Sequence, residues 1–231
     1  MLLTLPIRDV LPATPRARIA RIDLDGQAFD YAPGQAVAIA SHGFDKRRPY
    51  SIAAAPDDAR RDHWLELLIG VNVDGTAGPH LTLAGGQLVD VEGPLGSFTF
   101  PPAPAERRFV FIAGGTGIAP LRAMMRHALT LPHRNIGLFY SVRTPEEFAY
   151  EVELRGLARG GEIELRQTVT RASDADWSGP RGRLNREALA ELVHDPQTLC
   201  FVCGPPALVD EMPKLLADLG VPRERIHLEQ W

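Results

Sequence analysis

The residues whose types and spacing first suggest chemistry are the glycines within residues 109–121, FVFIAGGTGIAPL. An apolar run predicts a buried strand over 109–113, and an apolar-periodic helix follows over 118–129, with Pro120 in its opening turn. The turn between them consists of Gly114, Gly115, Thr116 and Gly117. Unpaired amides at a helix N-terminus carry about half a positive charge, and glycines let a phosphate approach the backbone. A pyrophosphate would suit this turn. However, Pro120 stands where the dinucleotide fingerprint has its third glycine, so the turn alone is equally consistent with a plain strand-to-helix junction.

The composition of the chain narrows the kinds of protein to which it can belong. The chain has 231 residues, of which 45% are hydrophobic and 23% charged, as in a soluble globular protein of one large or two ordinary domains. The net charge of −4 argues against a nucleic-acid-binding protein. No apolar run approaches the roughly 20 residues of a membrane span, and the apolar N-terminus is too short for a signal-peptide core. We therefore expect a cytoplasmic protein.

The first hundred residues have the pattern of short strands separated by Gly and Pro. Strand-like runs cover 16–24, 36–40, 50–54, 64–71 and 87–92. This spacing predicts an antiparallel β-barrel, with one short helix at about 76–83.

A second pattern begins after the segment 100–108, FPPAPAERR, where we place a domain boundary. We expect one domain over 1–102 and another over 107–231. Beyond the boundary, strands are predicted over 109–113, 136–140, 162–169, 199–203 and 225–228, and helices over 118–129, 145–158, 185–193 and 206–219. This alternation predicts a parallel sheet with helices on both faces, and ligands of such sheets bind where the order of the strands reverses.

The cysteines and histidines give little support for a metal site. Cys200 and Cys203 form a C-x-x-C pattern, but residues three apart on a strand point to opposite faces, roughly 10 Å apart. The seven histidines show no H-x-x-x-H spacing, and no run of cysteines predicts an iron–sulfur cluster. We expect no bound metal.

Four short motifs, taken in order, resemble those of the ferredoxin-NADP reductase superfamily, and the match spans nearly the whole chain. They are Arg48-Pro49-Tyr50-Ser51, Gly93-Pro94-Leu95-Gly96-Ser97-Phe98, the glycine turn, and Cys203-Gly204-Pro205-Pro206. Residues 45–70 look most like bacterial NAD(P)H:flavin reductases, whereas 93–98 looks more like reductases that retain FAD. The resemblance implies an FAD-binding barrel followed by an NAD(P)H-binding α/β domain.

The resemblance assigns roles to the first motif. Arg48 would pair with the flavin pyrophosphate, since a forked guanidinium suits two acceptor oxygens. With Pro49 in the same motif, Tyr50 would lie against the isoalloxazine ring and Ser51 would hydrogen-bond near flavin N5. Without the resemblance, Arg48 would be interpreted as a solvated surface residue and Tyr50 as packing on a strand.

The second motif has both a functional and a structural interpretation. Gly93 and Gly96 would leave room for backbone amides to contact the flavin phosphates, but Gly-Pro is also common in β-turns. The chain departs from the family at Gly78-Pro79-His80, because relatives commonly have a Ser or Thr there as a further phosphate donor. We therefore expect FAD to be held loosely.

In the second domain, the resemblance assigns the glycine turn, together with Pro120, to the pyrophosphate of the nicotinamide dinucleotide. Cys203 would lie near the nicotinamide ring and help to align it, and Gly204 and Pro205 would shape the pocket. A buried cysteine at the end of a strand is more often inert packing, so we do not interpret Cys203 as a nucleophile.

The C-terminus and two arginines complete the predicted site. Glu229 would support proton movement, and Trp231 would cover the flavin face that the nicotinamide must reach. A frayed terminus or a hydrophobic plug is an equal alternative for Trp231. Arg143 and Arg171 follow predicted strands and could meet a 2′-phosphate, which favours NADPH slightly over NADH.

The resemblance implies a flavin-dependent oxidoreductase that passes a hydride from NAD(P)H to FAD, in the cleft between the domains, and then electrons to a separate acceptor. That acceptor would be a ferredoxin, a flavodoxin or an oxygenase component. A flavin reductase that uses free flavin as its substrate is the alternative, and a binding or regulatory subunit without turnover is a third possibility.

Overall fold

A computed structural model describes residues 1–171 and 177–230 of the chain. The structure divides into two compact units. The first contains Met1–Pro102 and Arg122–His127, and the second contains Ala103–Leu121 and Ala128–Trp231. None of the helices in the described residues has the length and apolar character that crossing a membrane requires.

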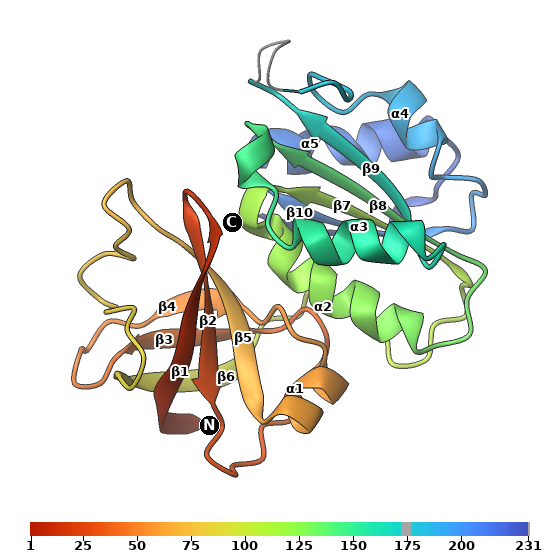
Figure 1. Cartoon of the computed structure of the whole chain (residues 1–231). Coiled ribbons are helices and arrows are strands. Elements are labelled where there is room, and N and C mark those ends of the chain that lie inside the picture. Colours follow the sequence, from red (N-terminus) through yellow and green to blue (C-terminus); the bar gives the residue numbers. More distant parts are fainter. Residues whose placement is uncertain (172–176, 231) are drawn as a thin grey trace. The chain divides into compact units, whose positions relative to one another are not determined.

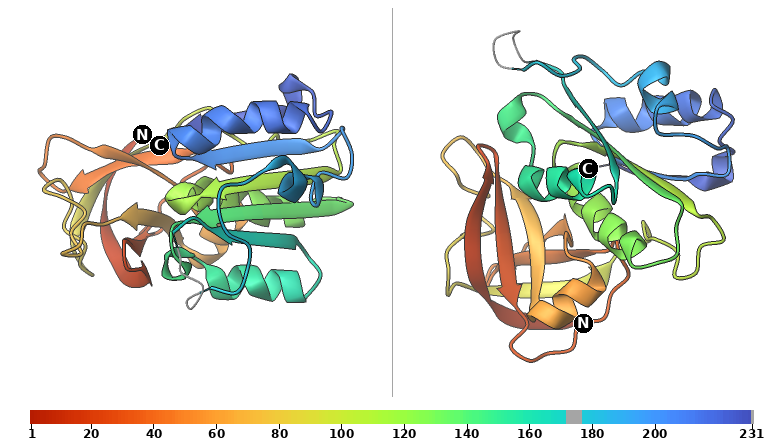
Figure 2. Two further views of the ribbon diagram at one scale, coloured as in Figure 1. Left: turned by 90° about the horizontal axis from the view of Figure 1, so that it is seen from above. Right: turned by 45° about the vertical axis from the view of Figure 1, so that its right-hand side comes forward.

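The first unit is built on a six-stranded antiparallel sheet with the strand order β4-β3-β6-β1-β2-β5 (Figures 1 and 2). Its strands are β1 (Leu2–Thr14), β2 (Ala17–Asp23), β3 (Ala36–Ser41), β4 (Arg48–Ser51), β5 (Trp64–Gly70) and β6 (Leu88–Leu95). Directly after β4, an isolated bridge pairs Ile52 with Leu67 of β5, and the N–H of Ala53 donates to the carbonyl of Glu66 at 2.7 Å. This bridge brings the two edge strands of the sheet together, as the predicted barrel requires.

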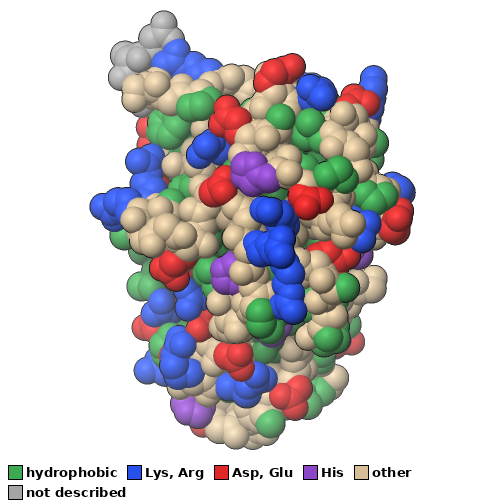
Figure 3. Space-filling model, turned by 90° about the vertical axis from the view of Figure 1, so that its right-hand side faces the viewer, with side chains coloured by type: hydrophobic (Ala, Val, Ile, Leu, Met, Phe, Trp, Pro, Cys, Tyr) green, Lys and Arg blue, Asp and Glu red, His purple; other side chains and the backbone are tan. Residues whose placement is uncertain are grey.

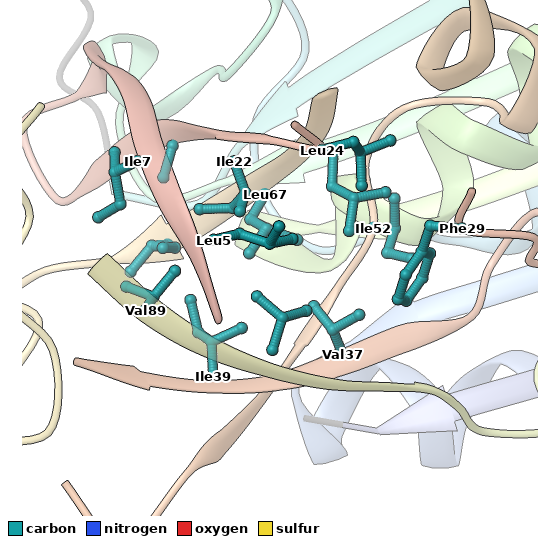
Figure 4. Packing of buried hydrophobic residues seen from close by; sticks show 14 of the residues in the cluster. Leu5, Ile7, Ile22, Leu24, Phe29, Val37, Ile39, Ile52, Leu67 and Val89 are labelled. Carbon is teal, nitrogen blue, oxygen red and sulfur yellow. The ribbon is translucent and has the colours of Figure 1, made fainter. Parts of the chain in front are cut away.

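Alternating apolar residues of these strands form the core of the first unit. Leu5 and Ile7 of β1, Val37 and Ile39 of β3, and Val89 of β6 are almost fully buried and point into one cluster (Figure 4). Period-two alternation places such residues on a single face of each strand. Tyr50 of β4, the strand that carries the first motif, packs against this cluster.

The first unit differs from the sequence prediction at three places. The segment 76–83 forms turns rather than a helix, because the left-handed backbone of Gly78, with φ +101°, cannot continue a helix. A helix instead forms at α1 (Pro56–Asp62), which the sequence analysis did not predict. Its signals are a proline in its first turn, two aspartates there and two arginines in its last turn. Strand β1 is also absent from the predicted strands.

The second unit contains a five-stranded parallel sheet with the order β11-β10-β7-β8-β9. Its strands are β7 (Arg108–Gly114), β8 (Asn135–Val142), β9 (Glu164–Val169), β10 (Leu199–Gly204) and β11 (Ile226–Gln230). The chain runs outward from β7 to β9 and then returns to β10, on the other side of β7. The order therefore reverses between β7 and β10, and ligands of open α/β sheets bind at such a position.

Helices lie on both faces of this sheet, as the alternating pattern predicted. The α-helices are α2 (Ile118–Leu129), α3 (Glu151–Arg159), α4 (Arg186–Ala190) and α5 (Pro206–Ala217), and short 3-10 turns are η1 (Gly115–Gly117), η2 (Pro145–Glu147) and η3 (Arg223–Arg225). Apolar residues of α4 and α5 pack on Val110, Ile112 and Val202 of the sheet, and α3 lies on the opposite side (Figure 1). The expected helix over 145–158 is shorter than predicted, because 145–147 forms a separate turn.

Charged side chains are mixed on the face of the molecule drawn in Figure 3. Lys and Arg side chains lie among Asp and Glu side chains there, with one short run of basic residues near the centre. This mixture agrees with the small net charge of −4.

Candidate functional site

The first motif forms β4, at one edge of the barrel sheet. Tyr50 pairs with Val37 of β3, and Ser51 pairs with Ala36. The side chain of Arg48 is exposed and forms no ion pair or hydrogen bond with any residue that the structure describes. Its neighbour Arg47, by contrast, is paired with Glu92, with Nε and Oε2 3.0 Å apart. The guanidinium of Arg48 is therefore available for an anion.

Tyr50 is half-buried against the barrel core and forms a hydrogen bond with His80. The phenol oxygen lies 2.8 Å from His80 Nε2, and the planes of the two rings are almost parallel. Burial raises the pKa of Tyr50 above its ordinary value, and Arg48 opposes that shift. Sequence analysis noticed His80 only as a departure from the family; its burial and its bond to Tyr50 leave no sequence signal.

The two glycines of the second motif have different surroundings. A Cβ on Gly93 would lie 3.0 Å from Val37 Cγ1 and 3.3 Å from the carbonyl oxygen of Ala36, so the close packing against β3 favours a glycine there. Gly96 is exposed with open space around its Cα, and its carbonyl accepts a hydrogen bond of 3.1 Å from Gln35 Nε2. Their contact with flavin phosphates stays a prediction, for which Gly96 has the room.

The glycine turn lies where the strand order of the parallel sheet reverses. Strand β7 ends at Gly114, η1 covers Gly115–Gly117, and α2 begins at once. A Cβ on Gly114 would lie 2.7 Å from Pro205 Cδ and 3.5 Å from the Cα of Gly204, so the turn packs directly against the end of β10. The predicted glycine turn and the Cys203-Gly204-Pro205-Pro206 motif are thus brought together.

Pro120 is buried in the first turn of α2. The helix begins at Ile118, two residues before this proline. A proline is tolerated there because that N–H would have no partner within the helix. Neither η1 nor the first turn of α2 contains an acidic residue, so no carboxylate competes for the positive end of the helix. The residues present therefore fit a phosphate group.

Tyr140 on β8 is a further residue at this turn that sequence analysis did not single out. Its buried hydroxyl donates to the carbonyl of Gly115 at 3.1 Å and accepts from the N–H of Ala149 at 3.2 Å. Gly115 has a left-handed backbone, with φ +55°. The phenol thus holds Gly115 in place. A residue with a side chain would be strained in this left-handed conformation.

Cys203 and Glu229 occupy paired positions on β10 and β11. The thiol donates to Glu229 Oε2 at 3.8 Å, and burial together with Glu229 raises the pKa of the thiol above its ordinary value. Both Cys200 and Cys203 are buried free thiols. A protonated buried thiol is a poor nucleophile, which agrees with the positioning role expected for Cys203.

The two arginines predicted to meet a 2′-phosphate are close in the backbone. The N–H of Arg171 donates to the carbonyl of Arg143 at 2.8 Å, just beyond the ends of the paired strands β8 and β9, and both side chains are exposed. The carboxylate of Glu147 accepts from the N–H of Arg143 at 3.4 Å. Trp231, the predicted cover of the flavin, lies outside the described residues.

Comparisons with known proteins agree with these two units. The oxidoreductase FAD-binding domain family matches residues 8–100, and the oxidoreductase NAD-binding domain family matches residues 111–214. Ferredoxin-NADP reductase B of Sorangium cellulosum is 35% identical over 238 residues, which cover 96% of this chain and 94% of that protein. The reductase subunit of an aromatic O-demethylase of an Amycolatopsis species is 33% identical, over 99% of this chain and 71% of that protein.

Solved structures show the same fold. The ferredoxin reductase in carbazole 1,9a-dioxygenase superposes with a TM-score of 0.84 at 24% identity, over 100% of this chain and 69% of that protein. The N-terminal antiparallel sheet and the C-terminal parallel sheet with helices are thus a ferredoxin reductase fold. The family matches and the identity to the Sorangium protein confirm the predicted FAD and NAD(P)H cofactors and show that the chain belongs to the ferredoxin-NADP reductase superfamily of oxidoreductases.

Proposed function

We propose that this chain is an NAD(P)H-dependent FAD oxidoreductase that supplies electrons to a separate acceptor protein. Bound FAD supplies the redox chemistry, because it can accept a hydride from NAD(P)H and release electrons singly. The observation that supports the proposal most strongly is Arg48, an exposed guanidinium without an ion partner among the described residues, two positions before Tyr50.

The protein's own residues would bind and orient the two cofactors. Arg48 would bind the flavin pyrophosphate with its forked guanidinium, while Tyr50 and Ser51 on the same strand would set the position of the flavin ring. Gly96 would admit backbone contacts to the phosphates. These assignments rest on the family motif and on the placement of β4.

In the second unit, the glycine turn and the start of α2 would bind the pyrophosphate of NAD(P)H. Cys203 would orient the nicotinamide as a neutral thiol, and Glu229 would hold a proton on its carboxyl group beside it. Arg143 and Arg171 would contact a 2′-phosphate, which favours NADPH. Higher kcat/KM with NADH than with NADPH would contradict that preference.

The proposed acceptor is a ferredoxin, a flavodoxin or an oxygenase component. The named relatives include a ferredoxin-NADP reductase and the reductase subunit of an aromatic O-demethylase, and no cluster of three metal-binding side chains occurs in the described part of this chain. Stopped-flow reduction of purified candidate acceptors by the loaded protein and NAD(P)H would rank them.

A second function, reduction of free flavin, is favoured by one observation. The segment 76–83 forms turns, and Gly78-Pro79-His80 provides no hydroxyl donor where relatives commonly have one, so FAD could leave more readily. The absorbance spectrum of the purified protein after exhaustive desalting separates the two functions. Retained FAD near one equivalent supports the electron carrier, whereas a colourless protein that oxidises NAD(P)H only with added flavin supports the flavin reductase. Absence of NAD(P)H oxidation with flavin, ferricyanide or ferredoxin would indicate a subunit without turnover.

A further inference from the structure

His80 is a buried titratable residue to which the proposed function gives no role. It is 1% exposed, and its Nε2 lies 2.8 Å from the phenol oxygen of Tyr50. The ring centroids are 6.1 Å apart and the two ring planes are almost parallel, with an angle of 9° between them. The distance between the phenol oxygen and Nε2 is that of a hydrogen bond.

The backbone holds His80 in this position. The N–H of Ser41 donates to the carbonyl of His80 at 2.8 Å, and the N–H of Thr82 donates to Ser41 Oγ at 2.9 Å. Ser41 ends β3, the strand that pairs with Tyr50 through Val37. One strand therefore positions both partners of the hydrogen bond.

The second nitrogen of His80 decides which partner donates. Nδ1 is buried and has no hydrogen-bond partner. If Tyr50 donated to Nε2, the proton of the neutral ring would be on Nδ1, as a buried N–H with no acceptor. If Nε2–H donates to Tyr50, Nδ1 is an unmet acceptor. Orphaned N–H groups are rarer in proteins than under-satisfied acceptors, so the second arrangement is favoured.

The surroundings of His80 keep its imidazole ring neutral, so that only one of its two nitrogens carries a proton. Burial lowers the pKa of His80, and the positive charge of Arg48 lowers it further. The same arginine acts on Tyr50, so its guanidinium is near both members of the pair. Arg48 has no ion partner in the described residues, so its positive charge is available to an anion that binds near this pair.

We infer that His80 donates its Nε2 proton to Tyr50 and so leaves the phenol O–H free to donate to an acceptor oxygen of the phosphate–ribityl chain of FAD. This inference rests on the proposed function and adds to it a positioning residue from the Gly78-Pro79-His80 segment. His80 itself does not touch the cofactor, because its free nitrogen is buried. It acts by fixing the direction in which Tyr50 donates.

The first test needs no cofactor. In the flavin-free full chain labelled with ¹⁵N-histidine, NMR distinguishes protonated from bare ring nitrogens, and the signals that disappear in His80→Gln assign His80. We expect a protonated Nε2 and a bare Nδ1 at neutral pH. A protonated Nδ1 would overturn the inference, whatever the protein binds.

The second test measures flavin affinity by fluorescence quenching during reconstitution. His80→Phe removes the donor, and Tyr50→Phe removes the phenol. Each is expected to weaken FAD binding about tenfold, and the double variant no more than either alone, because both act through one hydrogen bond. His80→Gln keeps an N–H donor at similar reach and should remain within about threefold of the wild type.

The outcomes separate the inference from the proposed function. If the two Phe variants bind FAD and FMN more weakly but bind riboflavin normally, the acceptor is a phosphate oxygen. If they bind all three flavins more weakly, the acceptor is a ribityl hydroxyl. Either result supports the inference. His42→Phe, at an exposed histidine after β3, is the control and should bind as the wild type does. Normal FAD affinity in His80→Phe, or additive losses in the double variant, would overturn the inference while the flavoenzyme stands. A wild-type chain that binds no flavin would contradict both.

Discussion

Cys203 and Glu229 face each other across the paired strands β10 and β11, with the thiol donating to the carboxyl oxygen Oε2 at 3.8 Å. Burial raises the pKa of Glu229 above its ordinary value, and the bond from Cys203 opposes that shift only in part. The pair therefore places a carboxyl that readily holds a proton at the end of the parallel sheet, on β11, with β10 between it and the strand β7 that leads into the glycine turn.

This raised pKa predicts a pH-dependent contribution to stability. A folded state that binds a proton more tightly than the unfolded state gains stability that is fully present below the ordinary pKa and is lost as the pH rises through the raised value. Glu229→Gln, which stays uncharged, should therefore gain stability relative to the wild type as the pH rises from about 4 to about 8. Urea unfolding of both proteins across this range measures the difference. Parallel stability curves would contradict the prediction.

Arg48 and Arg47 offer a matched pair of neighbouring arginines. Arg48 has no ion partner in the described residues, whereas Arg47 pairs with Glu92 at the surface. Arg48→Ala should weaken FAD binding at least about tenfold, since a charge-assisted bidentate contact is lost, and leave the unfolding free energy almost unchanged. Arg47→Ala should leave FAD affinity intact. Equal effects of the two variants on fluorescence-monitored FAD binding would contradict a specific role for Arg48.

Tyr140 is expected to hold the glycine turn in its binding conformation. Tyr140→Phe leaves the buried N–H of Ala149 without its acceptor and releases the carbonyl of Gly115, at a cost of about 1–3 kcal/mol of stability. The KM for NAD(P)H should rise more than kcat falls. Denaturant unfolding and steady-state kinetics check the two effects.

Tyr31 provides the control for this prediction, because its phenol donates to the carbonyl of Ala54 at 2.8 Å within the first unit. Tyr31→Phe should lose about 1 kcal/mol of stability and leave the KM for NAD(P)H unchanged. A similar rise in that KM in both variants would mean that Tyr140 acts only through general stability.

A substitution at Gly117 would test how closely the glycine turn packs against the end of β10. A Cβ there would overlap the carbonyl oxygen of Cys203 and lie 2.6 Å from its carbonyl carbon, so the backbones would have to separate. Gly117→Ala should destabilise the protein by about 3 kcal/mol, whereas Gly70→Ala, at an exposed site with open space, should change stability by less than about 1 kcal/mol. Thermal unfolding of the two variants gives the comparison. A stable Gly117→Ala would show that the turn does not pack as described.

The second unit followed from its sequence more closely than the first. Strands β7 and β10 are largely continuous apolar runs that end at a glycine, so both strands and their C-terminal ends could be predicted from the sequence. In the first unit, β1 contains Pro6 and Pro12, which obscure a strand pattern, and α1 is too short for a visible helical period. In the same unit, the glycines between residues 71 and 87 are typical of turns. The structure has turns over 76–83, where the sequence analysis expected a helix.

Within the candidate site, sequence motifs identified single residues but not the contacts between distant ones. Arg48 and Cys203 stand in recognisable motifs. His80 and Tyr140 do not, because their roles come from hydrogen bonds to Tyr50 and Gly115, which lie 30 and 25 residues away in the chain. A tyrosine inside an apolar strand and a histidine in a loop carry no local pattern that predicts such partners.

The central claim, that NAD(P)H reduces FAD on this chain, is tested most directly without any acceptor. The FAD-loaded protein is mixed anaerobically with one equivalent of NADPH, or of NADH, and the visible absorbance of oxidised flavin is followed by stopped flow. The account predicts that this absorbance bleaches faster than for the same concentration of free FAD, and that Arg48→Ala, in a mixture with the same total flavin, bleaches less. Flavin that stays oxidised with both nucleotides would contradict the account.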